Sequence, residues 1–185
     1  MLVQASPYAV ISSDLARARA TAEPIAARCD LPLQLDPRLR ELHLGAWQGL
    51  TLAEARDRFP DEHAAWVAGE DVRRGGGESF RDAGERAHAC LVEAVEAVPP
   101  GATVIAVTHG GTARAALGRL LELDAPEWWR FTVLGNTCWS TLVEARRGWR
   151  LERHNTGLGP LLGAATGALD TGTRPVGSPD AEPVK

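Results

Sequence analysis

The chain has 185 residues and a mass of 19.8 kDa, which is enough for one domain with a substantial hydrophobic core. Its net charge of −4 gives no basis for binding nucleic acid or an anionic membrane surface. No apolar run approaches the length of a membrane span, and the N-terminus lacks the charged and then apolar pattern of a secretion signal. The three cysteines lie far apart without metal-ligand spacing, and such a scattered, odd set predicts a reducing, cytoplasmic location.

Secondary structure can be predicted from the pattern of apolar residues along the chain. Two short apolar segments rich in β-branched residues, 7–13 and 103–107, predict buried strands. Helices are predicted over 14–29, 51–59, 61–69, 80–98 and 111–123. The predicted helix caps are Asp14, Thr51 with Glu54 as a capping box, and Ser79. The segments 139–145 and 149–154 alternate in polarity around a glycine turn and predict a β-hairpin.

This order of elements defines a fold class. Strands that alternate with helices predict an α/β protein, a three-layer sandwich around a mostly parallel central sheet. The composition changes near residue 157 to Gly, Pro, Ala and Thr without any sustained period. We therefore expect one domain over residues 1–156 and a disordered tail over 157–185.

Two predicted strands end in polar or cationic side chains. In open α/β sheets, ligands bind at the carboxyl ends of the strands. Ser12 and Ser13 end the first strand, with Arg17 and Arg19 in the helix that follows, and His109 with two glycines ends the second. An arginine fork over a helix N-terminus suits an oxyanion or a phosphate. Taken singly, His109 is more commonly a hydrogen-bonded strand-end histidine, and Arg17 an exposed helix arginine.

Five motifs follow one another in a fixed order: ISSDLARARATAEPIA, LRELHLGAWQGL, GGGES, VTHGG and NTCWSTL. Together they resemble the histidine phosphatase superfamily, which includes phosphoglycerate mutases and broad-specificity acid phosphatases, across residues 10–155. The resemblance is strongest to the phosphatase-type members. It implies the phosphoglycerate mutase-like fold and hydrolysis of a small phosphomonoester through a phosphohistidine intermediate. It implies no cofactor and no metal, and none of the five histidines has metal-ligand spacing to another His or Cys.

The resemblance also implies roles for individual residues. Arg17 would bind the phosphoryl group, and His109 and the backbone N–H of Gly110 would stabilise that group during transfer. Glu78, in GGGES, would be the general acid that protonates the leaving alkoxide. Asn136, in NTCWSTL, would orient groups near the site.

Other motif residues are assigned structural or undecided roles. Arg73 and Arg74 precede GGGES and either meet an anionic substrate or, more commonly for such runs, form a solvated charged surface. A structural role in shaping the fold beside the pocket is expected for Arg40, Glu41, Gly45, Trp47 and Gly49.

One motif of the family has no counterpart in the sequence. The family nucleophile is a histidine in an Arg-His-Gly motif at the end of the first strand, a few tens of residues before SSDL. Only twelve residues precede Ser13, and none is a histidine. We therefore expect the first strand and its helix to lie upstream of Met1, in a longer protein. The alternatives are an inactive pseudophosphatase that binds phosphorylated ligands or a protein partner, and a generic α/β anion-binding module without a special role for Glu78.

Two further expectations depend on this missing strand. Arg153-His154 resembles half of the nucleophile motif, as in a circular permutant, but the alternating segment around it favours an ordinary last strand. A sheet without its first strand would expose unpaired edges, and strand pairing would then favour a homodimer.

Overall fold

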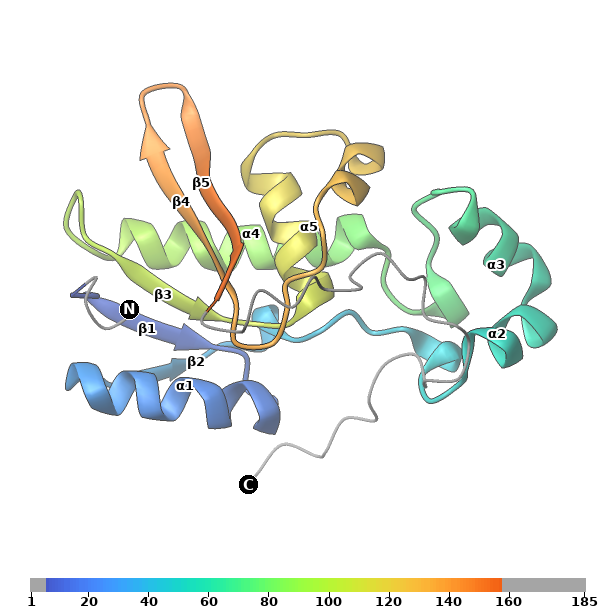
Figure 1. Cartoon of the computed structure of the whole chain (residues 1–185), viewed down its shortest axis with the longest axis horizontal. Coiled ribbons are helices and arrows are strands. Elements are labelled where there is room, and N and C mark those ends of the chain that lie inside the picture. The colour runs from blue at the N-terminus through green and yellow to red at the C-terminus, as the bar shows by residue number, and fades with distance from the viewer. Residues whose placement is uncertain (1–5, 158–185) are drawn as a thin grey trace.

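The computed structural model describes residues 6–157, so the tail predicted after residue 157 lies outside the described residues (Figure 1). The strands are β1 (Ala9–Ser12), β2 (Leu33–Leu35), β3 (Val104–Val107), β4 (Trp139–Ala145) and β5 (Gly148–Thr156). The α-helices are α1 (Ala16–Cys29), α2 (Leu52–Arg58), α3 (Pro60–Val67), α4 (Phe80–Glu96) and α5 (Gly110–Leu120). Short 3-10 helices are η2 (Pro37–Leu39), η3 (Gly45–Trp47), η4 (Arg74–Gly76) and η5 (Ala125–Arg130). Within residues 6–157, no helix is long and apolar enough to cross a membrane.

The central sheet is parallel, with strand order β2-β1-β3. Val10 of β1 lies opposite Leu33 on one side and Ile105 on the other. Because all three strands run in the same direction, the residues that follow β1 and β3 meet at one edge of the sheet. This edge is where the sequence predicts the site.

Side chains of the sheet alternate between two helical layers. Val10 and Ile105 pack with Ala26 of α1, whereas Ile11 packs on the other face with Ala87 of α4. Figure 1 shows α1 below the sheet and α4 and α5 above it. Because successive side chains of a strand point to opposite faces, the helices bury both faces of the sheet. The predicted three-layer α/β sandwich is therefore confirmed.

The predicted hairpin is also present. β4 and β5 pair antiparallel and form a second, two-stranded sheet apart from the β2-β1-β3 sheet. Ala145 pairs with Gly148, and the φ angle of +105° at Gly148 places this residue where glycine is favoured. His154 lies within β5, the last strand among residues 6–157, as expected from the alternating segment around it.

A lobe of α2 and α3 lies beyond the carboxyl ends of the central strands (Figure 1). Trp47 is fully buried there, and its ring contacts the rings of Phe59, His63 and Trp66 at centroid distances of 6.0–6.3 Å. The lobe shares a hydrophobic cluster with α4, α5 and η5.

Two of the three predicted caps are confirmed. Thr51 and Glu54 form a reciprocal capping box at the start of α2, and Ser79 forms a second with Asp82 at the start of α4. The prediction for Asp14 was wrong, since α1 begins without a side-chain cap. Asp14 instead forms an ion pair that is described below.

Two loops approach each other closely beside the lobe. A Cβ atom on Gly45 would lie 2.0 Å from the carbonyl oxygen of Gly75, and one on Gly77 would lie 2.0 Å from that of His43. In addition, Glu78 N–H donates to the His43 carbonyl at 2.7 Å. Only glycine permits this backbone contact, which joins the segment after β2 to the segment before α4.

We expect Gly77→Ala to lower the free energy of unfolding by about 3 kcal/mol or more, because the neighbouring backbone cannot move away cheaply. Gly76→Ala is the matched control. A Cβ added to Gly76 would meet nothing within 4 Å. The φ angle of +74° at this residue is unfavourable for alanine, so the substitution should lower the free energy of unfolding by about 1 kcal/mol. Urea unfolding of both variants measures the difference, and equal losses would contradict the close contact at Gly77.

Candidate active site

The carboxyl edge of the sheet brings together groups that are about 90 residues apart in the sequence. Arg17 Nε, in the first turn of α1, donates to His109 Nδ1 at 3.2 Å. His109 Nε2 lies 2.9 Å from Ser13 Oγ. Ser13 is fully buried and His109 is 8% exposed. The two strand ends predicted to form the site therefore meet in the structure.

These contacts define the proton arrangement on the imidazole. Because Arg17 Nε is a donor, the facing Nδ1 of His109 is the acceptor and carries no proton. The proton of the neutral ring then lies on Nε2 and is donated to Ser13 Oγ. The same oxygen accepts the backbone N–H of Leu15 at 3.3 Å. The ring is therefore held by one cationic donor and one buried acceptor.

The start of α5 holds a carboxylate. Glu41 accepts hydrogen bonds from the backbone N–H groups of Gly111 and Thr112 at 3.1 and 2.9 Å. These residues are the second and third after His109. A carboxylate is stabilised at a helix N-terminus by these donors and by the helix dipole. The backbone N–H of Gly110 precedes these two donors, and no described residue accepts a hydrogen bond from it.

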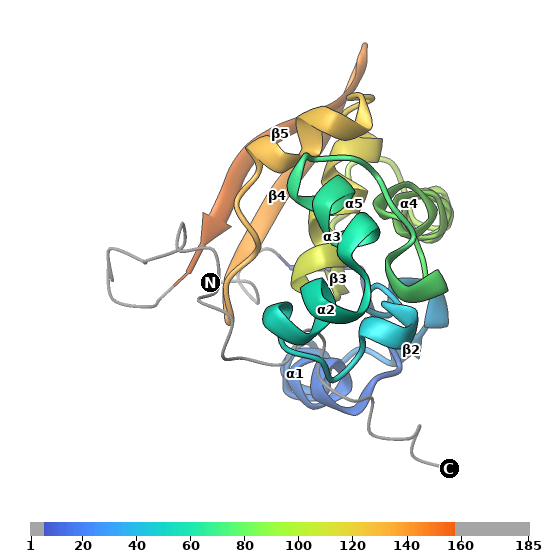
Figure 2. The same ribbon diagram turned by 90° about the vertical axis from the view of Figure 1, so that its right-hand side faces the viewer.

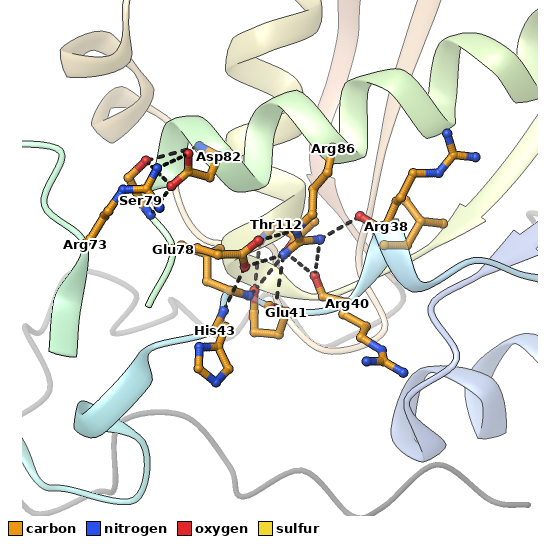
Figure 3. A network of polar contacts seen from close by, with 12 residues as sticks. Arg38, Arg40, Glu41, His43, Arg73, Glu78, Ser79, Asp82, Arg86 and Thr112 are labelled. Atoms are coloured by element: carbon orange, nitrogen blue, oxygen red, sulfur yellow. Dashed lines mark hydrogen bonds and ion pairs between the residues drawn. The ribbon is translucent and has the colours of Figure 1, made fainter. Parts of the chain in front are cut away.

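Arg86 of α4 fixes the segment that carries Glu41. Its Nη1 donates to the carbonyl oxygens of Arg38 and Arg40 at 2.6 and 2.8 Å, and its Nη2 donates to that of Glu41 at 3.3 Å. Both Nε and Nη2 also donate to the carboxylate of Glu78, at 2.7 and 2.9 Å. Figure 3 shows this guanidinium between Glu78 and the 38–41 segment. Glu78 thus orients Arg86, and Arg86 orients the backbone of Glu41.

The surroundings of Glu78 favour its ionised form. Partial burial raises the pKa of this carboxyl, but the hydrogen bonds from Arg86 and from the backbone N–H of His43, at 2.9 Å, outweigh burial. The net effect is a pKa below the usual value for glutamate. A carboxyl that is ionised in this way is a poor proton donor.

Asp14 and Arg40 form an ion pair at the rim of the site. Arg40 Nε donates to Asp14 Oδ1 at 2.7 Å, and the hydrogen bond from Arg40 lowers the pKa of Asp14 despite partial burial. The pair joins the start of α1 to the segment after β2. Arg40 is therefore structural, as the sequence predicts.

The two arginines before GGGES differ in their surroundings. Arg73 is exposed and pairs with Asp82 at 2.7 Å, as in a solvated charged surface. Arg74 is only 7% exposed, and its guanidinium lies over the rings of Trp66 and Phe80. The interpretation as a charged surface thus describes Arg73 but not Arg74.

The loop before β4 covers the start of α5. A Cβ atom on Gly110 would lie 2.5 Å from Val133 Cγ1. Asn155 holds this loop, since its amide accepts Gly135 N–H at 2.9 Å and donates to the Val133 carbonyl at 3.2 Å. Asn136 is exposed, and its role in orienting site groups stays a prediction.

Three residues at the site were not expected from the sequence: Ser13 as the partner of His109, Glu41 at the helix start, and Arg86. The position of Glu41 inside the LRE motif was the available signal, although the motif was interpreted as structural. Arg86 is one of two arginines in the amphipathic helix α4, and nothing in the sequence distinguishes it. Within residues 6–157, no three His, Cys, Asp or Glu side chains are grouped closely enough to hold a metal ion.

Fold and site together define an α/β protein in which Arg17, His109 and Glu41 lie at the carboxyl edge of a parallel sheet. Residues 2–157 match the model of the histidine phosphatase superfamily, branch 1. The chain belongs to this superfamily.

Similar proteins include several phosphatases. The glucosyl-3-phosphoglycerate phosphatase of Mycobacterium tuberculosis is 36% identical over 149 residues, which cover 77% of this chain and 67% of that protein. The metal-independent phosphoserine phosphatase of Arabidopsis thaliana is 39% identical over 122 residues, which cover 64% of this chain and 51% of that protein. Among solved structures, a mycobacterial glucosyl-3-phosphoglycerate phosphatase in complex with VO3 has a TM-score of 0.76 at 34% identity, covering 84% of this chain and 80% of that one.

Proposed function

We propose that the site binds the phosphoryl group of a small phosphomonoester and takes part in its hydrolysis. The observation that carries this proposal is the contact of Arg17 with His109 across the two strand ends, beside the backbone N–H of Gly110 at the start of α5. Transfer of a phosphoryl group spreads negative charge over its three equatorial oxygens, and such a set of donors can stabilise that charge. Solved structures of the mycobacterial relative with VO3 and with inorganic phosphate support this choice of ligand.

Each group has a role in this proposal. Arg17 and the N–H of Gly110 bind phosphoryl oxygens, and His109 exchanges the contact of its Nε2–H with Ser13 Oγ for a hydrogen bond to the transferring group. We assign the general acid to Glu41, because the backbone N–H groups of Gly111 and Thr112 hold it at the start of α5 next to His109, whereas Glu78 forms an ion pair with Arg86.

The family reaction uses a phosphohistidine intermediate, and the sequence contains no Arg-His-Gly motif. A second candidate function is the binding of phosphorylated ligands without turnover, which the contact of Arg17 with His109 also supports. Removal of a covalent nucleophile costs about a millionfold in rate in another class of enzyme. The two functions therefore differ sharply in turnover while they share phosphate binding.

Thermal unfolding with inorganic phosphate or vanadate, together with hydrolysis of 4-nitrophenyl phosphate, tests both functions. A ligand at about a hundred times its Kd adds about 2.7 kcal/mol of stability, which raises the Tm by roughly 5–10 °C for a domain of this size. We expect this rise, and turnover in addition to it would support hydrolysis. A rise without turnover would support the binding function alone, and no rise with either anion would exclude both.

A further inference from the structure

A cavity of about 370 Å³ lies between the segment after α3, the start of α4, the middle of α5 and η5. Figures 1 and 2 show the segment after α3 and η5 next to each other beside α5. This volume falls within the range of small-molecule binding pockets. The residues that line it include Glu70, Asp71, Phe80, Arg114, Trp128 and Trp129.

Arg114 is the cationic group of this cavity. Its guanidinium lies 5.0 Å from the centre of the Trp129 ring, and its Nε is buried without a hydrogen-bond partner among the described residues. Burial alone lowers the pKa of Arg114, and no carboxylate within residues 6–157 pairs with it. A guanidinium whose face lies on an aromatic ring still presents its N–H groups at the edge, where an anion can bind.

The walls of the cavity are flat and aromatic. The rings of Phe80 and Trp129 meet edge to face at a centroid distance of 5.1 Å. Trp128 is held between two helices, because Gly84 of α4 and Gly118 of α5 leave room for its indole. A Cβ atom on Gly84 would lie 2.9 Å from the indole, and one on Gly118 would lie 2.2 Å from it. Its Nε1 donates to the carbonyl of Leu123 at 3.0 Å. These walls suit a ring that stacks or packs against them.

The two carboxylates of the cavity leave the charge of Arg114 available. Asp71 accepts the backbone N–H groups of Phe80 and Arg81 at the start of α4, at 2.7 and 3.1 Å, so the N-terminus of this helix offsets part of its charge. Glu70 is exposed at the rim, where solvent screens its charge. An anion in the cavity would therefore meet a partly desolvated cation, which strengthens their interaction.

We propose that this cavity is a binding site for a small organic anion with a ring-shaped body, the anionic group on Arg114 and the ring against Trp129 and Phe80. The site is separate from the contacts of Arg17, His109 and Glu41. The inference does not depend on phosphatase activity, so the two proposals can fail independently.

Benzoate is a suitable probe, and benzamide is its neutral counterpart with the same ring. The protein has six tryptophans, whose indole N–H signals are resolved by ¹H–¹⁵N NMR. We expect benzoate to shift the Trp129 signal saturably, and benzamide to bind at least tenfold more weakly. Arg114→Gln should weaken benzoate binding at least tenfold and leave benzamide binding unchanged.

Arg119→Gln is the matched control, because Arg119 lies on the same helix and pairs with Glu85 on the surface. It should bind benzoate like the wild type. Trp129→Leu changes a ring that is 40% exposed, so the fold tolerates it, and both probes should then bind more weakly. The proposal is overturned if benzoate does not bind saturably, if both probes bind equally, or if Trp129→Leu leaves both affinities unchanged.

Discussion

Arg17→Gln should abolish most of the stabilisation by phosphate or vanadate and lower turnover about 10²–10³-fold, the effect of removing one donor from a preorganised oxyanion site. The glutamine keeps much of the side-chain length but loses the charge and the planar fork that match phosphoryl oxygens. His109 also loses the donor on its Nδ1, while the contact of its Nε2 with Ser13 Oγ remains. Thermal shift and steady-state kinetics measure both effects.

Arg19→Gln is the control for this experiment. Arg19 lies on the same helix and forms a surface ion pair with Glu23, so its loss should change stability by about 0.3–0.5 kcal/mol and leave phosphate binding intact. If both variants bind phosphate as the wild type does, the phosphoryl group is not bound at the start of α1.

Glu41→Gln should lower hydrolysis of an alkyl phosphate, such as glycerol 2-phosphate, about 10²–10⁴-fold, because the alkoxide leaving group needs a proton. Hydrolysis of 4-nitrophenyl phosphate should fall much less, since the nitrophenolate is stable without protonation. The difference between the two substrates separates loss of the acid from loss of structure. The glutamine retains an oxygen that accepts the N–H groups of α5.

Glu78→Gln is the competing experiment, because the sequence motif assigns the acid to this residue. We expect it to lower the free energy of unfolding by about 1–2 kcal/mol through its lost contact with Arg86, and to lower hydrolysis of both substrates to a similar, small extent. If Glu78→Gln selectively lowers hydrolysis of the alkyl phosphate and Glu41→Gln does not, the general acid is Glu78 and not Glu41.

Local signals predict most of the fold. The β-branched runs that become β1 and β3, and the capping boxes at Thr51 and Ser79, depend on residues close in sequence. Asp14 shows the limit of such signals. A carboxylate before a helix favours capping, but Arg40, 26 residues away, binds it instead.

The site was predictable in its location but not in its details. Parallel strands place their carboxyl ends together, so Arg17 and His109 could be expected to meet. The proposal of Glu41 in place of Glu78 could not be reached from the sequence, because it depends on Arg86, which lies on another helix and binds Glu78 directly. Similarly, adjacent Arg73 and Arg74 look alike in the sequence, and only packing separates the exposed one from the buried one.

The contacts of His109 have a consequence for folding. They join residues that are 92 and 96 positions apart, and closing such long loops is entropically costly until most of the sandwich has formed. The anion site should thus be absent from early folding intermediates. Recovery of phosphate binding during refolding would then follow completion of the sheet, and its rate would report on the slowest step of folding.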